Sequence, residues 1–337
     1  MSKEFLVVLV DDNAHEAILD EERKELEAVG GTIRAVDCFS EEDIIAAAKD
    51  ADVLTTDHAP ITRHILESLP NLKAVIRRGV GFDVVDLQAA TDNGVVVINI
   101  PTFCGEEVSN HVLMFLLNTA KKFTLISSLT KAGKWKEAKD AQKPMACIHG
   151  ETLGIVGCGR LGQMVAKKAK ALGMRVIGYD SYLPQHVFEE IGVESVSFDQ
   201  LLQESDYVTL HVALTDETRH MMNAEAFAKM KPTATLINTS RGPVVDEPAL
   251  IEALRKGQIA GAGLDVFEQE PIDPANPLLA MDNVLVMPHS ASYSEAAFSL
   301  LRTNAGKEEV RIAQGSMPMN LVNKGVTPKA NLAPYQA

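Results

Sequence analysis

Residues 153–162 read Leu153-Gly154-Ile155-Val156-Gly157-Cys158-Gly159-Arg160-Leu161-Gly162 and lie near the middle of the 337-residue chain. They join an apolar run, typical of a buried strand, to a glycine-rich turn that opens a helix. In this spacing the first glycine permits a tight turn and the second lets the backbone approach a pyrophosphate. The third lets the helix pack closely on the strand, and the phosphates lie at the positive end of that helix. The stretch predicts a dinucleotide site rather than a plain strand–turn–helix.

The loop supplies five of the predicted cofactor-binding residues, which are Gly157, Gly159, Arg160, Leu161 and Gly162. Arg160 is expected to help neutralise the pyrophosphate, and a surface charge is the alternative. Asp180 ends the next apolar run, R-V-I-G-Y-D, where a ribose-binding acid is expected. A carboxylate there would repel a 2′-phosphate, and Ser181 adds no cation. We therefore expect NAD rather than NADP.

Short apolar runs alternate with helical patterns on both sides of the motif, which predicts parallel sheets. Ser40 and Thr62 are the expected helix caps in the first hundred residues. Residues 106–131 predict one long apolar helix, and residues 294–314 predict another. Strands before the motif are expected at 5–10, 32–36, 53–55, 74–76 and 95–99.

The layout predicts an α/β protein with two doubly wound parallel-sheet domains, in which a Rossmann cofactor domain is inserted into a flavodoxin-like substrate domain. Residues 1–101 and 293–325 would form the substrate-binding domain. Residues 102–292 would form the NAD-binding domain, and residues 326–337 would be an extended or frayed tail.

Three residues follow successive predicted strands of the cofactor domain: Arg241 in I-N-T-S-R-G, Glu270 in D-V-F-E-Q-E-P and His289 in V-M-P-H-S. Ligands collect at the carboxyl ends of such strands. Reduction of a 2-keto acid needs a group for the carboxylate, a group that polarises the ketone and a proton donor. A histidine beside a carboxylate suits the last role. Each residue alone has a structural alternative, and their joint occurrence favours catalysis.

These stretches resemble the D-isomer-specific 2-hydroxyacid dehydrogenase family, as do R-R-G-V-G-F-D (77–83) and L-H-V-A-L-T-D-E-T-R-H (210–220). The resemblance implies that Arg241 binds the substrate and polarises the carbonyl, that His289 donates the proton and that Glu270 is its partner. It also implies that Val80 and Gly81 offer backbone N–H groups to the substrate carboxylate. Asp265 would face the nicotinamide, and the protein would be a homodimer formed through the cofactor domain.

Within the family, F-D-V-V-D and P-H-S-A-S-Y-S-E are similar to the branch that contains the C-terminal binding protein corepressors. In that branch an arginine at position 77 reaches the substrate. Because strand side chains alternate, only one of Arg77 and Arg78 can face the site, and Arg77 is favoured. The alternative to an enzyme is an NAD(H)-sensing corepressor-type binding protein with little turnover.

Two further residues are candidates for cofactor binding. Thr239 lies in I-N-T-S-R-G, and His211 ends a strand near the adenosine half of the cofactor, where a hydrogen-bonded structural histidine is the alternative. No metal ion is expected, since His58 and His64 are separated by a proline with no coherent ligand geometry.

The composition sets limits on partners. The net charge of −14 disfavours nonspecific binding to nucleic acid or to an anionic membrane. No run approaches the ~20 apolar residues that span a bilayer. The four scattered cysteines and an N-terminus that reads as a first strand favour a cytoplasmic protein. The expected partner is a small 2-keto or 2-hydroxy acid.

Overall fold

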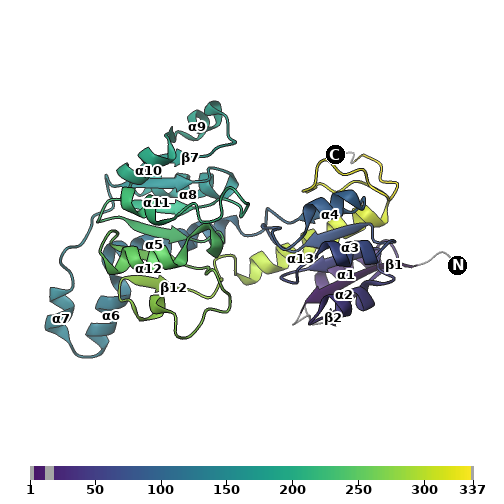
Figure 1. Ribbon diagram of the computed structural model, residues 1–337, viewed down its shortest axis with the longest axis horizontal. Helices are drawn as coiled ribbons and strands as arrows, with labels where there is room; N and C mark the ends of the chain where they lie inside the picture. Colours follow the sequence, from purple (N-terminus) through teal and green to yellow (C-terminus); the bar gives the residue numbers. More distant parts are fainter. Residues whose placement is uncertain (1–3, 12–18, 335–337) are drawn as a thin grey trace. The chain divides into compact units, whose positions relative to one another are not determined.

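The computed structural model describes residues 4–11 and 19–334. The chain divides into two compact units (Figure 1). Unit 1 comprises Met1–Cys104 and Ser294–Ala337, and unit 2 comprises Gly105–Tyr293. One unit is thus inserted into the sequence of the other, as the fold class predicted.

Unit 1 contains a five-stranded parallel sheet in the order β2-β1-β3-β4-β5. This order is the flavodoxin-like one, and it confirms the predicted class. Its strands are β1 (Phe5–Asp11), β2 (Gly31–Asp37), β3 (Val53–Thr56), β4 (Ala74–Arg77) and β5 (Val96–Asn99). Its helices are α1 (Asp20–Glu27), α2 (Glu41–Ala48), α3 (Arg63–Ser68), α4 (Leu87–Asp92) and α13 (Glu295–Ala313).

The predicted caps hold in unit 1, because the side chains of Ser40 and Thr62 accept hydrogen bonds from Asp43 N and Ile65 N. Residues 326–334 are extended rather than frayed. Among them, Lys329 N donates to Gly94 O at 2.9 Å, and Ala333 N donates to Gly315 O at 2.7 Å. These bonds fasten the segment to unit 1.

Unit 2 contains a seven-stranded parallel sheet in the order β12-β11-β10-β9-β6-β7-β8. The order reverses between β6 and β9, and ligands bind at such a switch point. Its strands are β6 (Thr152–Val156), β7 (Arg175–Tyr179), β8 (Glu194–Ser195), β9 (Tyr207–Leu210), β10 (Thr235–Asn238), β11 (Gly261–Leu264) and β12 (Val284–Val286).

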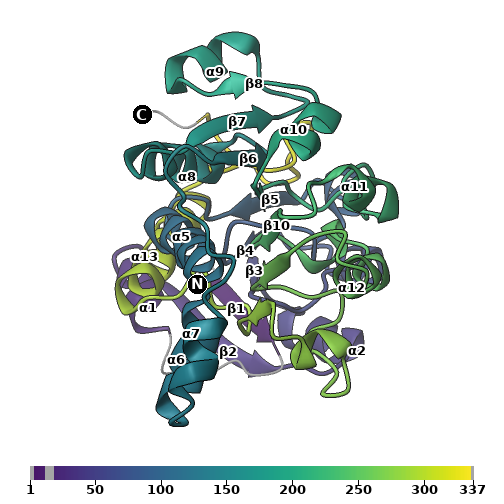
Figure 2. The ribbon, with the colours of Figure 1, turned by 90° about the vertical axis from the view of Figure 1, so that its left-hand side faces the viewer.

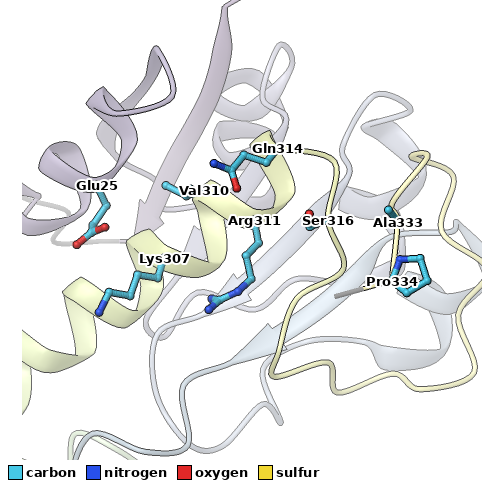
Figure 3. Close-up of a pocket in the computed structure, with 8 residues that line it drawn as sticks. All are labelled: Glu25, Lys307, Val310, Arg311, Gln314, Ser316, Ala333 and Pro334. Atoms are coloured by element: carbon cyan, nitrogen blue, oxygen red, sulfur yellow. The ribbon is translucent and has the colours of Figure 1, made fainter. Parts of the chain in front are cut away.

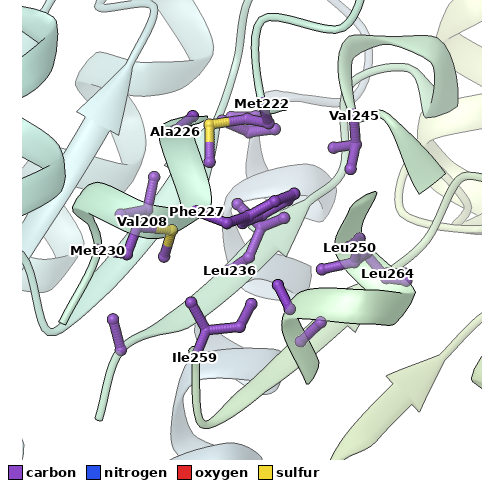
Figure 4. Packing of buried hydrophobic residues seen from close by; sticks show 14 of the residues in the cluster. Val208, Met222, Ala226, Phe227, Met230, Leu236, Val245, Leu250, Ile259 and Leu264 are labelled. Carbon is purple, nitrogen blue, oxygen red and sulfur yellow. The ribbon is translucent and has the colours of Figure 1, made fainter. Parts of the chain in front are cut away.

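Helices cover this sheet and bury its apolar side chains. On one side Phe227, Leu236 and Leu250 belong to a continuous cluster (Figure 4). The helices of unit 2 are α5 (Gly105–Lys121), α6 (Phe123–Lys131), α7 (Trp135–Asp140), α8 (Arg160–Ala171), α9 (Gln185–Ile191), α10 (Phe198–Glu204), α11 (Ala224–Lys229) and α12 (Glu247–Arg255), with 3-10 turns at Gly242–Val244 and Pro277–Ala280.

The single long helix predicted for residues 106–131 is wrong, because the chain bends by 61° between α5 and α6. Lys122 adopts a left-handed backbone with φ of 49°. Asn118 then accepts a hydrogen bond from Thr124 N at 3.0 Å, which satisfies an N–H group of the new helix. None of the residues of α6 is buried, and α6 and α7 stand apart from the sheet of unit 2 (Figure 1, Figure 2).

Within the described parts of the chain, no single helix is both long and apolar enough to cross a bilayer. Only α5 and α6 taken together, as a bent pair, have the required length and composition.

Candidate active site

The glycine-rich loop connects β6 to α8, and its three glycines meet different surroundings. Gly157 has a φ of +91°, and a Cβ there would lie 2.8 Å from the carbonyl carbon of His211. A Cβ on Gly162 would lie 2.2 Å from Gly157 O. Gly159 precedes α8, and a Cβ there would meet nothing within 4 Å. The fold therefore requires glycine at 157 and 162, whereas Gly159 borders open space beside the helix N-terminus.

Asp180, directly after β7, is bonded to the same loop. Its Oδ2 accepts a hydrogen bond from Cys158 N at 2.9 Å, and its Oδ1 accepts from Tyr182 N at 2.9 Å and Leu183 N at 3.1 Å. The carboxylate thus joins the glycine-rich loop to the turn after β7. Arg160 and Leu161 form the first turn of α8, with Arg160 exposed.

Two other predicted cofactor residues lie after neighbouring strands. The hydroxyl oxygen of Thr239, after β10, is buried and has no hydrogen-bond partner among the described residues. The ring of His211, after β9, is hydrogen-bonded to the Thr209 hydroxyl at 3.0 Å, and burial lowers its pKa to about 4. The His211 ring is therefore neutral and already bonded, and its backbone lines the turn at Gly157.

These observations fit a dinucleotide. The first N–H groups of a helix have no partner within the helix, so those of α8 beside Gly159 can bind phosphate. The buried Thr239 hydroxyl, which has no partner among the residues that the structure describes, could bond to a ligand. The residues that would hold the cofactor are Gly157, Gly159, Arg160, Leu161, Gly162, Asp180, Thr239 and Asp265.

Arg241, Glu270 and His289 follow β10, β11 and β12, three adjacent strands of the sheet. His289 Nδ1 lies 2.6 Å from Glu270 Oε2, and Glu270 Oε1 accepts a hydrogen bond from Phe267 N at 2.9 Å. Burial acts to raise the pKa of Glu270, but the bonds from His289 and Phe267 and the charge of Arg241 lower it overall. Glu270 is thus a carboxylate that fixes the orientation of the histidine ring.

Asp265 is 1% exposed and holds the turn that carries His289. Its carboxylate accepts hydrogen bonds from Ser290 N and Ala291 N, both at 2.8 Å, and its carbonyl accepts one from His289 N at 2.7 Å. His289 itself has a φ of +53°, which is uncommon for a residue other than glycine. The three bonds explain how this backbone conformation persists.

In unit 1 the two adjacent arginines have different surroundings. The Arg78 guanidinium is buried and bonded to Asp57 and to Glu22, which lies 3.1 Å away. Arg77 ends β4, and its guanidinium lies over Gly79, where a Cβ would lie 1.5 Å from Nη1. Arg78 is therefore part of a structural ion cluster, which leaves Arg77 as the arginine beside the R-R-G-V-G loop.

The R-R-G-V-G loop also carries backbone N–H groups that could donate hydrogen bonds to a ligand. Within residues 4–11 and 19–334 we find no hydrogen bond donated by the N–H groups of Val80 and Gly81, although Val80 O accepts one from Asn99 Nδ2 at 2.6 Å. No group of three or more metal-ligating side chains occurs in these residues either.

The ion cluster was not predicted from the sequence. Glu309 of α13 also belongs to it, through a 3.4 Å bond from the Thr55 hydroxyl. Burial, opposed by Arg78, raises the pKa of Glu22 to about 7, and burial together with Glu22 raises the pKa of Glu309 well above its usual value. No local pattern indicates this cluster, because its members come from four separate segments: α1, α13 and the residues that follow β3 and β4.

A surface pocket in unit 1 lies beside α1, the end of α13 and the extended C-terminal segment (Figure 3). None of the predicted site residues lines it. Its lining residues are Glu25, Lys307, Val310, Arg311, Gln314, Ser316, Ala333 and Pro334.

Comparison with known proteins shows the family to which the chain belongs. The family described as D-isomer specific 2-hydroxyacid dehydrogenase, NAD binding domain, matches residues 113–291. The chain is 43% identical over 291 residues to glyoxylate reductase of Korarchaeum cryptofilum, covering 85% of this chain and 87% of that protein. It is 38% identical over 329 residues to D-3-phosphoglycerate dehydrogenase of Methanocaldococcus jannaschii, covering 96% of this chain and 61% of that protein.

The fold is similar to that of D-lactate dehydrogenase from Aquifex aeolicus, solved with NAD and lactic acid. The TM-score is 0.81 at 30% identity, covering 91% of this chain and 96% of that one. The family match, the sequence relatives and the fold agree: this chain belongs to the D-isomer-specific 2-hydroxyacid dehydrogenase family and is an NAD-dependent oxidoreductase of 2-hydroxy acids.

Proposed function

We propose that this protein interconverts a small 2-keto acid and the D-2-hydroxy acid, with Arg241, Glu270 and His289 acting at the reacting carbonyl. The observation that carries the proposal is the 2.6 Å contact between His289 and Glu270. It lies after strands adjacent to the one that carries Arg241, in the unit that holds the glycine-rich loop. The reaction needs an oriented acid/base group and a cation near the bound nucleotide, and this unit carries both.

In the reductive direction the Arg241 guanidinium binds the substrate and draws electron density toward the ketone oxygen. Glu270 accepts a hydrogen bond from His289 Nδ1–H, and the protonated ring carries a second proton on Nε2, which passes to that oxygen and leaves the ring neutral. When bound, the nicotinamide supplies the hydride that the carbonyl carbon receives. In the oxidative direction His289 takes the hydroxyl proton, and Glu270 stabilises the charged ring.

We assign the substrate carboxylate to Arg77 and to the N–H groups of Val80 and Gly81, because Arg78 is bonded to Glu22 and Asp57. Glycine at position 79 lets Arg77 fold over the loop, since a Cβ there would overlap the guanidinium.

The cofactor assigned to this site is NAD rather than NADP. Asp180 lies after β7 with its carboxylate against the loop, where a 2′-phosphate would meet a negative charge. Two related proteins named glyoxylate reductase, from Korarchaeum cryptofilum and Thermococcus litoralis, are 43% and 41% identical to this chain, and they support glyoxylate as the first substrate to test.

The assembly we propose is a homodimer through unit 2. Phe123 and Trp135, in the α6–α7 segment, are 66% and 67% exposed, and no residue of α6 is buried. Exposed aromatic side chains on a projecting segment are typical of an interface with another chain.

The experiment is an NADH oxidation assay with glyoxylate, pyruvate, hydroxypyruvate and bulkier 2-keto acids. We expect turnover of at least one small member and a clear preference for NADH over NADPH. If NADH binds, as measured by fluorescence titration, but no 2-keto acid is reduced, the enzymatic proposal is wrong. That outcome would favour the NAD(H)-sensing binding protein.

A further inference from the structure

A histidine on α5 lies behind the turn that carries His289. The His111 side chain is 11% exposed, and its Nε2 lies 3.5 Å from Asp265 Oδ1. That nitrogen is buried and makes no hydrogen bond of good geometry among the described residues. The sequence motifs assign it no role.

The place of His111 is set by close packing of α5 on β11. Its ring meets Phe115, one helical turn further on, edge to face, with ring centroids 4.9 Å apart. Phe115 is buried against Gly263 of β11, where a Cβ would lie 2.7 Å from the Phe115 ring. Because Asp265 follows β11 directly, this contact fixes His111 beside its carboxylate.

The Asp265 carboxylate is buried, so its charge needs donors from the protein. It is 1% exposed, and its donors among the described residues are neutral: the backbone N–H groups of Ser290 and Ala291, both at 2.8 Å, and the Ser290 hydroxyl at 3.5 Å. A buried carboxylate costs free energy unless further donors or a positive charge compensate it. His111 is the titratable side chain that approaches it from the opposing helix.

We propose that His111 is a positioning residue: its Nε2–H is directed at Asp265, and this holds the carboxylate that shapes the His289 turn. The assignment rests on the function proposed above, in which His289 is the acid/base group. Burial lowers the pKa of His111, and the charge of Asp265 opposes that shift. A neutral ring carries one N–H, and in this arrangement it resides on Nε2.

The kinetic test compares His111→Leu, which removes the donor, with His111→Gln, which restores an N–H donor of similar reach. His186→Leu, at an exposed histidine on α9 of the same unit, is the matched control. We expect His111→Leu to lower kcat by about 10–100-fold, since small displacements of a catalytic group cost that much. KM and the NADH dissociation constant should stay within about twofold of wild type, and His111→Gln should recover most of kcat.

Two results would overturn the assignment: a folded leucine variant with wild-type kcat, or a glutamine variant as impaired as the leucine one. A loss of thermal stability in His111→Leu that fully accounts for lost activity would also count against it, because a packing role predicts that pattern.

A second measurement needs neither turnover nor a variant. In the ¹⁵N NMR spectrum of the wild-type imidazoles, His111 should be protonated at Nε2 and unprotonated at Nδ1. The opposite tautomer leaves no N–H on the nitrogen that lies 3.5 Å from Asp265 Oδ1 and contradicts the proposal, even if the leucine variant does not fold. If wild type reduces no 2-keto acid while His111 shows the expected tautomer, the proposed function fails and the contact itself stands.

Discussion

Single residues decide most of the chemistry proposed for this protein. Asp180 illustrates the point, because its carboxylate accepts a backbone hydrogen bond from the glycine-rich loop and, in the proposed site, would repel a 2′-phosphate. The hydrogen bond is structural, and the proposed function adds the selection of NAD over NADP.

Asp180→Ala should raise the NADH dissociation constant by about tenfold or more, because a charge-assisted hydrogen bond contributes about 1.5–3 kcal/mol. The ratio of NADH to NADPH affinity should fall as well. Asp199→Ala, which removes an exposed carboxylate bonded to Lys229, serves as the control. Fluorescence titration of both cofactors measures the effect, and an unchanged preference for NADH would show that Asp180 does not discriminate.

The residue scale also shows what a sequence can and cannot predict. The contact between His289 and Glu270 was expected from the motifs, and the two residues do meet. Strand alternation predicts that only one of Arg77 and Arg78 faces the site, but it does not decide which. The difference comes from tertiary contacts, since Arg78 is bonded to Glu22 and Asp57. Likewise, nothing in the sequence around His111 indicates that it faces Asp265.

At the scale of elements, the turn between β6 and α8 depends on two kinds of glycine. Gly162 is needed because α8 packs against the backbone of Gly157, whereas Gly159 has open space around its Cβ position. Alanine substituted at each position in turn tests the packing role of Gly162 separately from the cofactor-binding role of Gly159.

Gly159→Ala should fold with wild-type stability but bind NADH at least about tenfold more weakly, because the methyl group blocks backbone approach to the pyrophosphate. Gly162→Ala should lower the free energy of unfolding by about 1–3 kcal/mol, as overpacked sites do. Thermal unfolding and NADH titration test both, with Gly325→Ala, at an unhindered position, as the control. Equal effects of the two variants on stability would refute the separation.

The ion cluster predicts a pH dependence of stability. Glu22 is faced by Arg78, Asp57 and Arg302, and its pKa rises from 4.5 to about 7 on folding. A raised folded-state pKa contributes stability that is fully present below pH 4.5 and is lost as the pH rises through about 7.

Glu22→Gln removes this titration. The difference in unfolding free energy, wild type minus variant, should therefore decrease between pH 5 and pH 8. Denaturant unfolding at several pH values measures it, with the exposed Glu67→Gln as control. A difference that is flat or grows with pH would show that Glu22 does not bind its proton more tightly in the folded state.

Periodicity and caps predicted the strands and most helices well, since these depend on local sequence. The break between α5 and α6 was missed because it depends on Lys122 adopting a left-handed backbone and on the Asn118 bond to Thr124. The strand order was inferred from the fold class, because register between distant strands leaves no local signal.

At the scale of the whole molecule, the proposed dimer gives a role to two of the exposed aromatic side chains, Phe123 of α6 and Trp135 of α7. Phe123→Glu combined with Trp135→Glu should convert the proposed dimer to a monomer, since two charges would be buried at its interface. Analytical ultracentrifugation measures the mass. A wild-type monomer, or a double variant that remains a dimer, would refute an interface at this segment.

The central claim is that His289 delivers the proton to the reacting oxygen. The most direct measurement is kcat for reduction of the best 2-keto acid by His289→Gln, together with its NADH dissociation constant. We expect kcat to fall by about 10²–10⁴-fold while the NADH dissociation constant stays within about twofold of wild type. A folded His289→Gln variant that turns over at the wild-type rate would contradict it.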